Sequence, residues 1–314
     1  MVSIFDTAIA NYNSGNQIIM DAINSHIDKM FPNQHIIRLP VEDISKNARK
    51  YCNLSAFSFV GGTNILNGNI NNYRQWDLTL HNILILKKCI LIGCGWFQYE
   101  NKSISKYTKW AYKRILHPNF IHSVRDEYTK NKLEKIGIKA INTGCPTLWD
   151  LNPALPGING RMKSKNCVIA LTDYNQNPER DLKLFEIINN NYTNVFLFPQ
   201  GTGDINYIQN LGISDKIKVL RPRLTEFNQI LSEGTDYIGT RLHAGIRAIQ
   251  LEQRSTIIGI DNRALEMGRD FNLPVLHEES LDSLSSIVNN SFNITLNIPK
   301  NNISDWKKQF IYEL

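Results

Sequence analysis

The sequence has few cysteines and no pattern that would join them. Its 314 residues include five cysteines, an odd number, and no two of them form a Cys-x-x-Cys pair. Disulfide frameworks and structural zinc sites both need cysteines at characteristic spacings. We therefore expect reduced, structural cysteines in a reducing compartment, and no metal site.

Long hydrophobic runs are also absent. The longest strongly apolar stretch, residues 83–97, is interrupted by Lys87 and Lys88 and is too short and too charged to cross a bilayer. The segment Met1–Asp6 lacks the basic and apolar regions of a secretion signal. These absences predict a cytoplasmic protein and leave open a peripheral contact with the inner membrane face.

The chain has no arginine-rich arm and no extended basic stripe with interleaved aromatic residues. Its 35 Lys and Arg against 29 Asp and Glu give a net charge of +6. Such a modest excess suits anionic ligands, such as phosphates and carboxylates, but does not indicate nucleic acid. The basic, aromatic segment Lys106–Arg114 fits either a solvated helix face with a buried stripe or a lipid-binding surface.

Short apolar runs alternate with stretches of helical period along the whole chain. Runs that are apolar throughout are typical of strands buried on both faces of a parallel sheet. The predicted strands are residues 2–5, 35–39, 56–60, 89–93, 122–125 and 140–143 in the first half, and 167–171, 194–198, 217–220, 237–239 and 256–260 in the second.

Residues 151–165 contain two prolines and two glycines and interrupt this alternation, so they predict an interdomain linker. We predict an α/β protein with two Rossmann-like, doubly wound domains that face a cleft. The first, residues 1–150, is expected on the acceptor side. The second, residues 151–314, ends in a helix around 303–312 that crosses back toward the first.

Ligands of doubly wound sheets bind at the carboxyl ends of the strands, so the residues after each predicted strand are candidates. Asn13 and Gly15 lie at the start of a helix, whose N–H groups attract anions. Gly62, Thr63 and Asn64 follow the third strand, where consecutive N–H groups can form an anion nest. A capped loop and a tight turn explain the same residues.

Three further polar residues follow later strands. Arg125 fits either a ligand carboxylate or phosphate, or a local pair with Asp126. Gln200 lies in the polar, glycine-rich segment 199–204. Arg263 is either a second cation for the same ligand or part of a helix-capping loop.

The segment Asp236–Gln250 carries the clearest chemical signal. A buried strand is followed by a helix, and the turn between them contains Arg241 and His243. Arginine offers a permanently charged fork to phosphate or carboxylate. Histidine titrates near neutral pH and serves as a general acid or base. The small residues Ala244 and Gly245 are expected to let a ligand approach the start of the helix.

These segments form an ordered set of motifs. They are Asn-x-Gly-Asn at 13–16, Gly-Gly-x-Asn at 61–64, Ile-Gly-x-Gly at 92–95, Val-Arg-Asp at 124–126 and Gly-x-Arg-x-His-x-x-x-x-Ala at 239–248. The set resembles the polysaccharide pyruvyl transferase family over nearly the whole chain. The family's motif arginine and histidine map onto Arg241 and His243, and Arg263 is the nearest basic residue to a lysine that many members carry downstream.

The resemblance implies a glycosyltransferase B-like architecture and transfer of pyruvate from phosphoenolpyruvate, without a further cofactor or metal. The product is a cyclic ketal on a sugar of a surface polysaccharide or its precursor, and the acceptor is a sugar or a lipid-linked oligosaccharide. Arg241 and His243 are then catalytic. The expected substrate-binding residues are Asn13, Gly15, Gly62, Thr63, Asn64, Arg125, Gln200 and Arg263.

Two alternatives remain open from the sequence. One is a glycosyltransferase of the same architecture that uses a nucleotide-sugar donor and holds its ribose with Asp261 or Glu266. The other is a non-catalytic subunit of a polysaccharide assembly complex.

Overall fold

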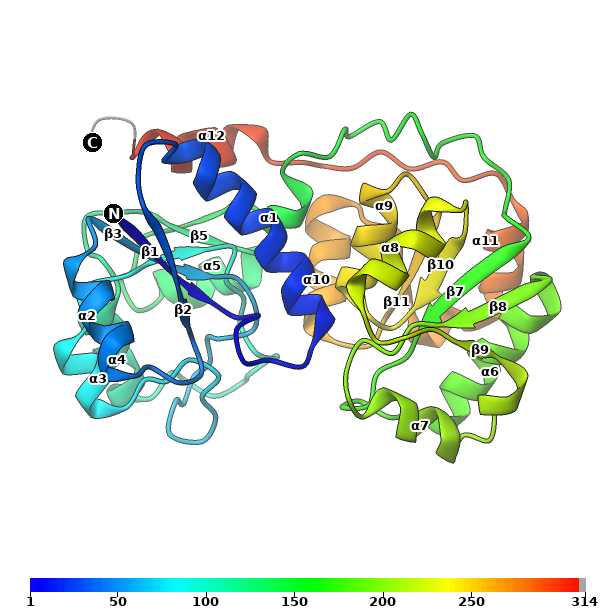
Figure 1. Cartoon of the computed structure of the whole chain (residues 1–314), viewed down its shortest axis with the longest axis horizontal. Helices are drawn as coiled ribbons and strands as arrows, with labels where there is room; N and C mark the ends of the chain where they lie inside the picture. Colours follow the sequence, from blue (N-terminus) through cyan, green and yellow to red (C-terminus); the bar gives the residue numbers. More distant parts are fainter. Residues whose placement is uncertain (311–314) are drawn as a thin grey trace. The chain divides into compact units, whose positions relative to one another are not determined.

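The computed structural model describes residues 1–310, and the chain divides into two compact units (Figure 1). The first comprises Met1–Asn11, Ile19–Trp149 and Ile298–Leu314, and the second comprises Tyr12–Ile18 and Asp150–Asn297. Two short segments depart from the predicted domain boundary at residue 150. Residues 12–18 belong with the second unit, and the C-terminal segment belongs with the first.

The first unit contains a parallel sheet in the order β2-β1-β3-β4, continued by the parallel pair β5-β6. A bridge between Cys94 and Val124 connects the end of β4 to β5. The strands are β1 Val2–Asp6, β2 Ile36–Pro40, β3 Phe57–Gly61, β4 Ile90–Ile92, β5 His122–Val124 and β6 Ala140–Asn142. Each of the six matches a strand predicted from the sequence.

Helices cover both faces of this sheet. They are α1 Ser14–Met30, α2 Lys46–Leu54, α3 Leu80–Ile85, α4 Lys106–Ile115, α5 Glu127–Glu134, the 3-10 turn η1 Pro146–Leu148, and α12 Lys300–Lys308. On one face, α2, α3 and α4 share a hydrophobic core with the strands. On the other, Phe59 of β3 contacts Trp306 of α12 and the following Phe310. A C-terminal helix is therefore present, at Lys300–Lys308 where 303–312 was predicted, and it packs on the first unit. Positions 311 and 312 of the predicted range lie outside the described residues.

The second unit is a six-stranded parallel sheet in the order β12-β11-β10-β7-β8-β9. Its strands are β7 Asn166–Ala170, β8 Asn194–Leu197, β9 Lys218–Val219, β10 Asp236–Gly239, β11 Ser255–Gly259 and β12 Val275–His277. Its helices are α6 Pro178–Asn191, α7 Asp204–Asn210, η2 Ser214–Lys216, α8 Leu224–Ser232, α9 Leu242–Gln250, α10 Asn262–Phe271, η3 Glu278–Ser283 and α11 Leu284–Asn289.

This strand order has a topological switch point between β7 and β10. The chain passes from β7 to β8 on one side and later enters β10 on the other, and ligands of doubly wound sheets bind at the carboxyl ends of the strands at such a point. The elements of this unit that were not predicted include β12, α7 and α11. β12 is a three-residue edge strand that is only partly buried, so it lacks the apolar run of a central strand.

The five cysteines are free and buried, as predicted for structural cysteines. None of the helices within residues 1–310 combines the length and the apolar composition that a bilayer crossing demands.

Candidate active site

The backbone of the motif segment is fixed at the switch point of the second unit. The Tyr237 hydroxyl donates to the Arg241 carbonyl oxygen at 2.7 Å, and the Thr240 N–H donates to the Ala170 carbonyl oxygen at 2.9 Å. A Cβ atom at Gly239 would lie 2.5 Å from that same Ala170 oxygen. The motif glycine is therefore needed because β10 passes very close to β7 just before Arg241.

The Arg241 side chain is buried at the ends of three strands. It is 3% exposed, and its Nε donates to the Leu171 carbonyl oxygen at 3.2 Å. Its Nη2 forms ion pairs with Asp173, at 3.0 Å, and with Asp204. Its other amino group, Nη1, makes no hydrogen bond to any residue in the described part of the chain. Two carboxylates thus compensate the buried charge, while one donor group is left for a ligand.

Asp204 connects Arg241 to the loop after β8. Its Oδ2 accepts the N–H groups of Gln200, at 2.9 Å, and Gly201, at 2.8 Å, while its Oδ1 accepts from Arg241. Burial raises the pKa of the Asp204 carboxyl, against the lowering effects of Arg241 and the Gly201 N–H. Asp204 therefore positions both the arginine and the loop.

Tyr174 places a second arginine beside the first. Its ring centre lies 5.1 Å from the guanidinium carbon of Arg241 and 5.2 Å from that of Arg263. Its hydroxyl accepts a hydrogen bond from Arg263, which also pairs with Asp261. Asp261 in turn caps α10, since its Oδ1 accepts the Ala264 N–H at 3.2 Å. The structure thus brings together the two arginines that the sequence placed after different strands.

His243 is the second residue of α9 and is 6% exposed. The expectation that Ala244 and Gly245 admit a ligand is wrong for the glycine. A Cβ at Gly245 would lie 2.4 Å from Cγ1 of Ile257, so this residue is small because α9 packs tightly on β11.

Asn13, Gly15 and Gln200 form one cluster within the second unit. The Asn13 Oδ1 accepts from the Gln200 Nε2 at 3.0 Å and from the Gly15 N–H at 2.9 Å. The Ser14 N–H donates to the Gln200 carbonyl oxygen at 3.0 Å, and a Cβ at Gly15 would lie 2.6 Å from Gln200 Nε2. The first amides of α1 are therefore already bonded, which matches the capped-loop interpretation.

The predicted residues of the first unit form a separate, tightly packed cluster. Arg125 is 1% exposed and donates to Asn64 Oδ1 and, at 3.0 Å, to Asp126 Oδ2. A Cβ at Gly95 would lie 2.2 Å from the Arg125 guanidinium carbon, and Thr63 accepts the Gly95 N–H through its carbonyl at 2.8 Å. Of the two roles open for Arg125, the structure shows the local pair with Asp126.

Gly62 has a similar packing role. A Cβ on this residue would lie 2.5 Å from the Gly93 carbonyl oxygen, so the loops after β3 and β4 can approach only because Gly62 lacks a side chain. Asp126 also caps α5, since its Oδ1 accepts the Thr129 N–H at 2.7 Å.

The sequence interpretation missed Asp173 and Tyr174 and gave Asp204 no role of its own. Asp173 and Tyr174 follow β7, the central strand, so the position rule that selected the other loops also applies to them. Across the described residues, no group of three or more His, Cys, Asp and Glu side chains is arranged to hold a metal ion.

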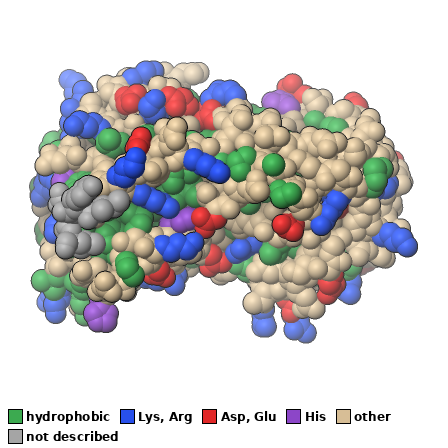
Figure 2. All heavy atoms as spheres, turned by 90° about the horizontal axis from the view of Figure 1, so that it is seen from above, with side chains coloured by type: hydrophobic (Ala, Val, Ile, Leu, Met, Phe, Trp, Pro, Cys, Tyr) green, Lys and Arg blue, Asp and Glu red, His purple; other side chains and the backbone are tan. Residues whose placement is uncertain are grey.

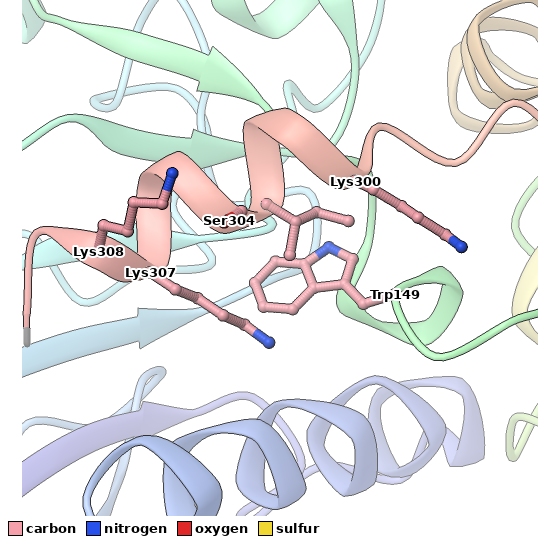
Figure 3. Close-up of a pocket in the computed structure, with 6 residues that line it drawn as sticks. Trp149, Lys300, Ser304, Lys307 and Lys308 are labelled. Atoms are coloured by element: carbon pink, nitrogen blue, oxygen red, sulfur yellow. The ribbon is translucent and has the colours of Figure 1, made fainter.

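A basic pocket of about 410 Å³ lies along α12 in the first unit (Figure 3). It is lined by Trp149, Lys300, Ile303, Ser304, Lys307 and Lys308. The Lys307 ammonium lies 4.9 Å from the centre of the Trp149 ring, and Lys and Arg side chains gather on this face of the molecule (Figure 2). None of the residues predicted from motifs lines this pocket.

Comparison with known proteins adds independent information. The family model of the polysaccharide pyruvyl transferases matches residues 13–262. A solved UDP-GlcNAc 2-epimerase of Methanocaldococcus jannaschii, in complex with UDP-GlcNAc and UDP, aligns over 98% of this chain and 98% of its own, at 14% identity and a TM-score of 0.53. The E. coli heptosyltransferase WaaC with ADP-2-deoxy-2-fluoro heptose aligns over 82% and 88%, at 9% identity and 0.38. No curated protein matches significantly.

The likeness to the epimerase extends over both units and shows the fold alone. It confirms the predicted class, an α/β protein with two Rossmann-like parallel sheets of the glycosyltransferase B type.

Proposed function

The chain belongs to the polysaccharide pyruvyl transferase family, and from this we propose that it transfers pyruvate from phosphoenolpyruvate to two hydroxyls of one sugar. The product is a cyclic ketal on a surface polysaccharide or its precursor. The observation that carries the proposal is the cluster of Arg241, Tyr174 and Arg263 in the segments that flank His243.

Phosphoenolpyruvate carries a phosphate and a carboxylate, so its site needs cations and N–H donors in one place. Arg241 contributes its Nη1 group, which is not used in bonds to the described residues, while Asp173 and Asp204 hold the guanidinium in position. Arg263 contributes a second guanidinium, whose carbon lies 5.2 Å from the centre of the same Tyr174 ring. The N–H groups in the first turn of α9 add positive potential at the same strand ends.

The reaction requires two proton transfers. Protonation of the methylene carbon of phosphoenolpyruvate turns it into a methyl group and leaves a cationic centre at the neighbouring carbon. One sugar hydroxyl bonds to that carbon. The second hydroxyl then replaces phosphate, which leaves with the bridging oxygen. One hydroxyl proton balances the new methyl C–H bond and the other is carried off with phosphate. We assign one of these transfers to His243 as general acid or base.

The residues named for a nucleotide sugar have structural roles. Asp261 caps α10 and pairs with Arg263, and Glu266 is buried and pairs with Arg269. Both carboxylates are engaged within the protein, which supports phosphoenolpyruvate over a nucleotide sugar as the donor.

The proposal is tested by incubating the protein with phosphoenolpyruvate and a panel of nucleotide sugars and lipid-linked oligosaccharides. We expect phosphate release that depends on the acceptor, a ketal product detected by mass spectrometry, and loss of both in His243→Ala at unchanged thermal stability. Thermal shift discriminates the donors, because a ligand stabilises the native state that binds it. Stabilisation by nucleotide sugars and not by phosphoenolpyruvate would contradict the proposal.

A non-catalytic subunit makes a different prediction in cells. If the protein only holds an assembly together, His243→Ala leaves the polymer's pyruvate content intact. We expect instead that this variant, at normal abundance, produces polymer without pyruvate.

A further inference from the structure

Three helices of the first unit form one continuous outer face. Figure 1 draws α2, α3 and α4 next to one another, and their inner sides share one hydrophobic core. Side chains also link them at the surface. Arg114 of α4 donates to the Leu84 carbonyl oxygen of α3 at 2.6 Å, and Asn53 of α2 donates to the Ile85 carbonyl oxygen at 3.1 Å. The three helices therefore present their outer sides as a unit, here called the α2–α3–α4 face.

Large apolar side chains are exposed on this face. Those at least one third exposed are Leu54 at 63%, Leu80 at 54%, Leu84 at 50%, Ile85 at 43%, Trp110 at 41% and Tyr51 at 38%. Single exposed apolar side chains are ordinary, but a group of six on linked helices indicates an interaction surface.

The charge of the face has one sign. The three helices contain seven Lys and Arg and no Asp or Glu, and Lys87 and Lys88 follow the C-cap residue of α3. The seven are Lys46, Arg49, Lys50, Lys106, Lys109, Lys113 and Arg114. The net charge of the whole chain is only +6, so the positive charge is concentrated here and the remainder is slightly acidic.

The exposed side of α4 combines both properties. Lys106, Lys109, Trp110 and Lys113 are exposed, whereas Thr108, Ala111, Tyr112 and Ile115 are buried. Positions 106, 109, 110 and 113 lie on one side of a helix. Tryptophan flanked by lysines suits the boundary between water and lipid, because the ring occupies the headgroup region while the lysine stems extend to the phosphates.

We propose that the α2–α3–α4 face binds the surface of an anionic lipid bilayer. The exposed Leu, Ile and Trp side chains enter the headgroup region, and the surrounding cations attract anionic lipids. A second copy of the chain is a poor occupant, since pairing this face with itself would set nine cations against nine. This binding needs neither donor nor acceptor, so its test does not depend on the proposed activity.

The test is cosedimentation of the full chain with phosphatidylcholine vesicles, with and without phosphatidylglycerol. We expect binding only to the anionic vesicles, weakened by added salt. Leu84→Glu and Trp110→Glu should each lower the partition coefficient about tenfold or more, and Lys109→Glu with Lys113→Glu at least as much, since each cation near an anionic surface contributes strongly.

Matched controls distinguish binding through this face from nonspecific hydrophobic adsorption and from an effect of net charge. Leu182 of α6 is 41% exposed in the second unit, and Leu182→Glu should bind like the parent protein. Lys300→Glu with Lys308→Glu changes the charge equally on α12, and should reduce binding much less than the α4 pair. Circular dichroism and thermal unfolding verify that every variant is folded.

Three results would overturn the proposal. The first is equal binding to neutral and anionic vesicles, or binding to neither. The second is an equal loss of vesicle binding in the α4 variants and their controls. The third is a dimer in analytical ultracentrifugation that Leu84→Glu converts to monomer. The last would assign the face to a second copy of the chain.

Discussion

In the second unit, the buried guanidinium of Arg241 is held in place by neighbouring residues. Arg241 is held by Asp173, Asp204 and a backbone carbonyl, so its position does not depend on a ligand. Removing one member of such a buried group leaves the others uncompensated and is strongly destabilising. Variants of Arg241 would therefore confuse loss of folding with loss of binding, and Arg263, which is more exposed, is the better probe.

We expect Arg263→Ala to raise KM for phosphoenolpyruvate about 10- to 100-fold, because a hydrogen bond to a charged group contributes about 1.5–3 kcal/mol. Arg263→Lys should recover most of the loss in affinity, because lysine restores the positive charge. The remainder reflects the missing planar guanidinium group. Arg269→Ala, on the same helix, is the control. An unchanged KM in Arg263→Ala would remove this residue from the donor site.

A second residue-scale prediction concerns His122 in β5. Burial lowers the pKa of His122 to about 4. Its Nδ1 accepts the Leu91 N–H at 3.1 Å. Protonation would turn Nδ1 into a donor as well, so two N–H groups would point at each other. Between pH 6.5 and 4 the unfolded chain binds a proton that the native state does not, so stability is lost as pH falls through this range.

The measurement is urea unfolding of the parent protein and His122→Gln at pH 7 and pH 5. We expect the fall in unfolding free energy between the two values to be about 2 kcal/mol smaller in the variant, because only the parent carries this linked proton. Parallel pH profiles would show that His122 is not responsible.

At the scale of elements, α12 completes the first unit although it lies at the other end of the chain. Trp306 is fully buried and contacts Phe59, Trp149 and Phe310. Trp306→Ala should therefore reduce the unfolding free energy by about 3–5 kcal/mol. Lys308→Ala, on the exposed side of the same helix, should change it by less than about 0.5 kcal/mol. Equal effects in denaturant titrations would mean that α12 is not part of this core.

At the scale of the whole molecule, the proposed donor site and the basic pocket along α12 are alternative places for an anion to bind. Hydrogen exchange of the intact chain with phosphoenolpyruvate distinguishes them. We expect slower exchange in residues 171–175, 200–204, 240–245 and 260–264, because a bound ligand suppresses local opening of the loops it contacts. Protection confined to α12 and the neighbourhood of Trp149 would place the donor in the basic pocket instead.

Much of the architecture follows from local sequence pattern. The apolar runs identified strands β1 to β11, because strands inside a parallel sheet are rich in apolar residues. The ordered motifs identified the family, and position after a strand selected Arg241 and Arg263, which both lie against the Tyr174 ring.

Only the tertiary structure decided what these residues contact. Arg125 and Arg241 look alike in sequence, each at a strand end, yet the first is enclosed by Asn64 and Asp126 while the second pairs with Asp173 and Asp204 and lies over the ring of Tyr174. Residues 12–18 group with the second unit through Gln200, nearly 190 positions away. Hydrogen bonds and close packing between residues so distant along the chain depend on how the sheets are wound, and periodicity in the sequence does not carry that information.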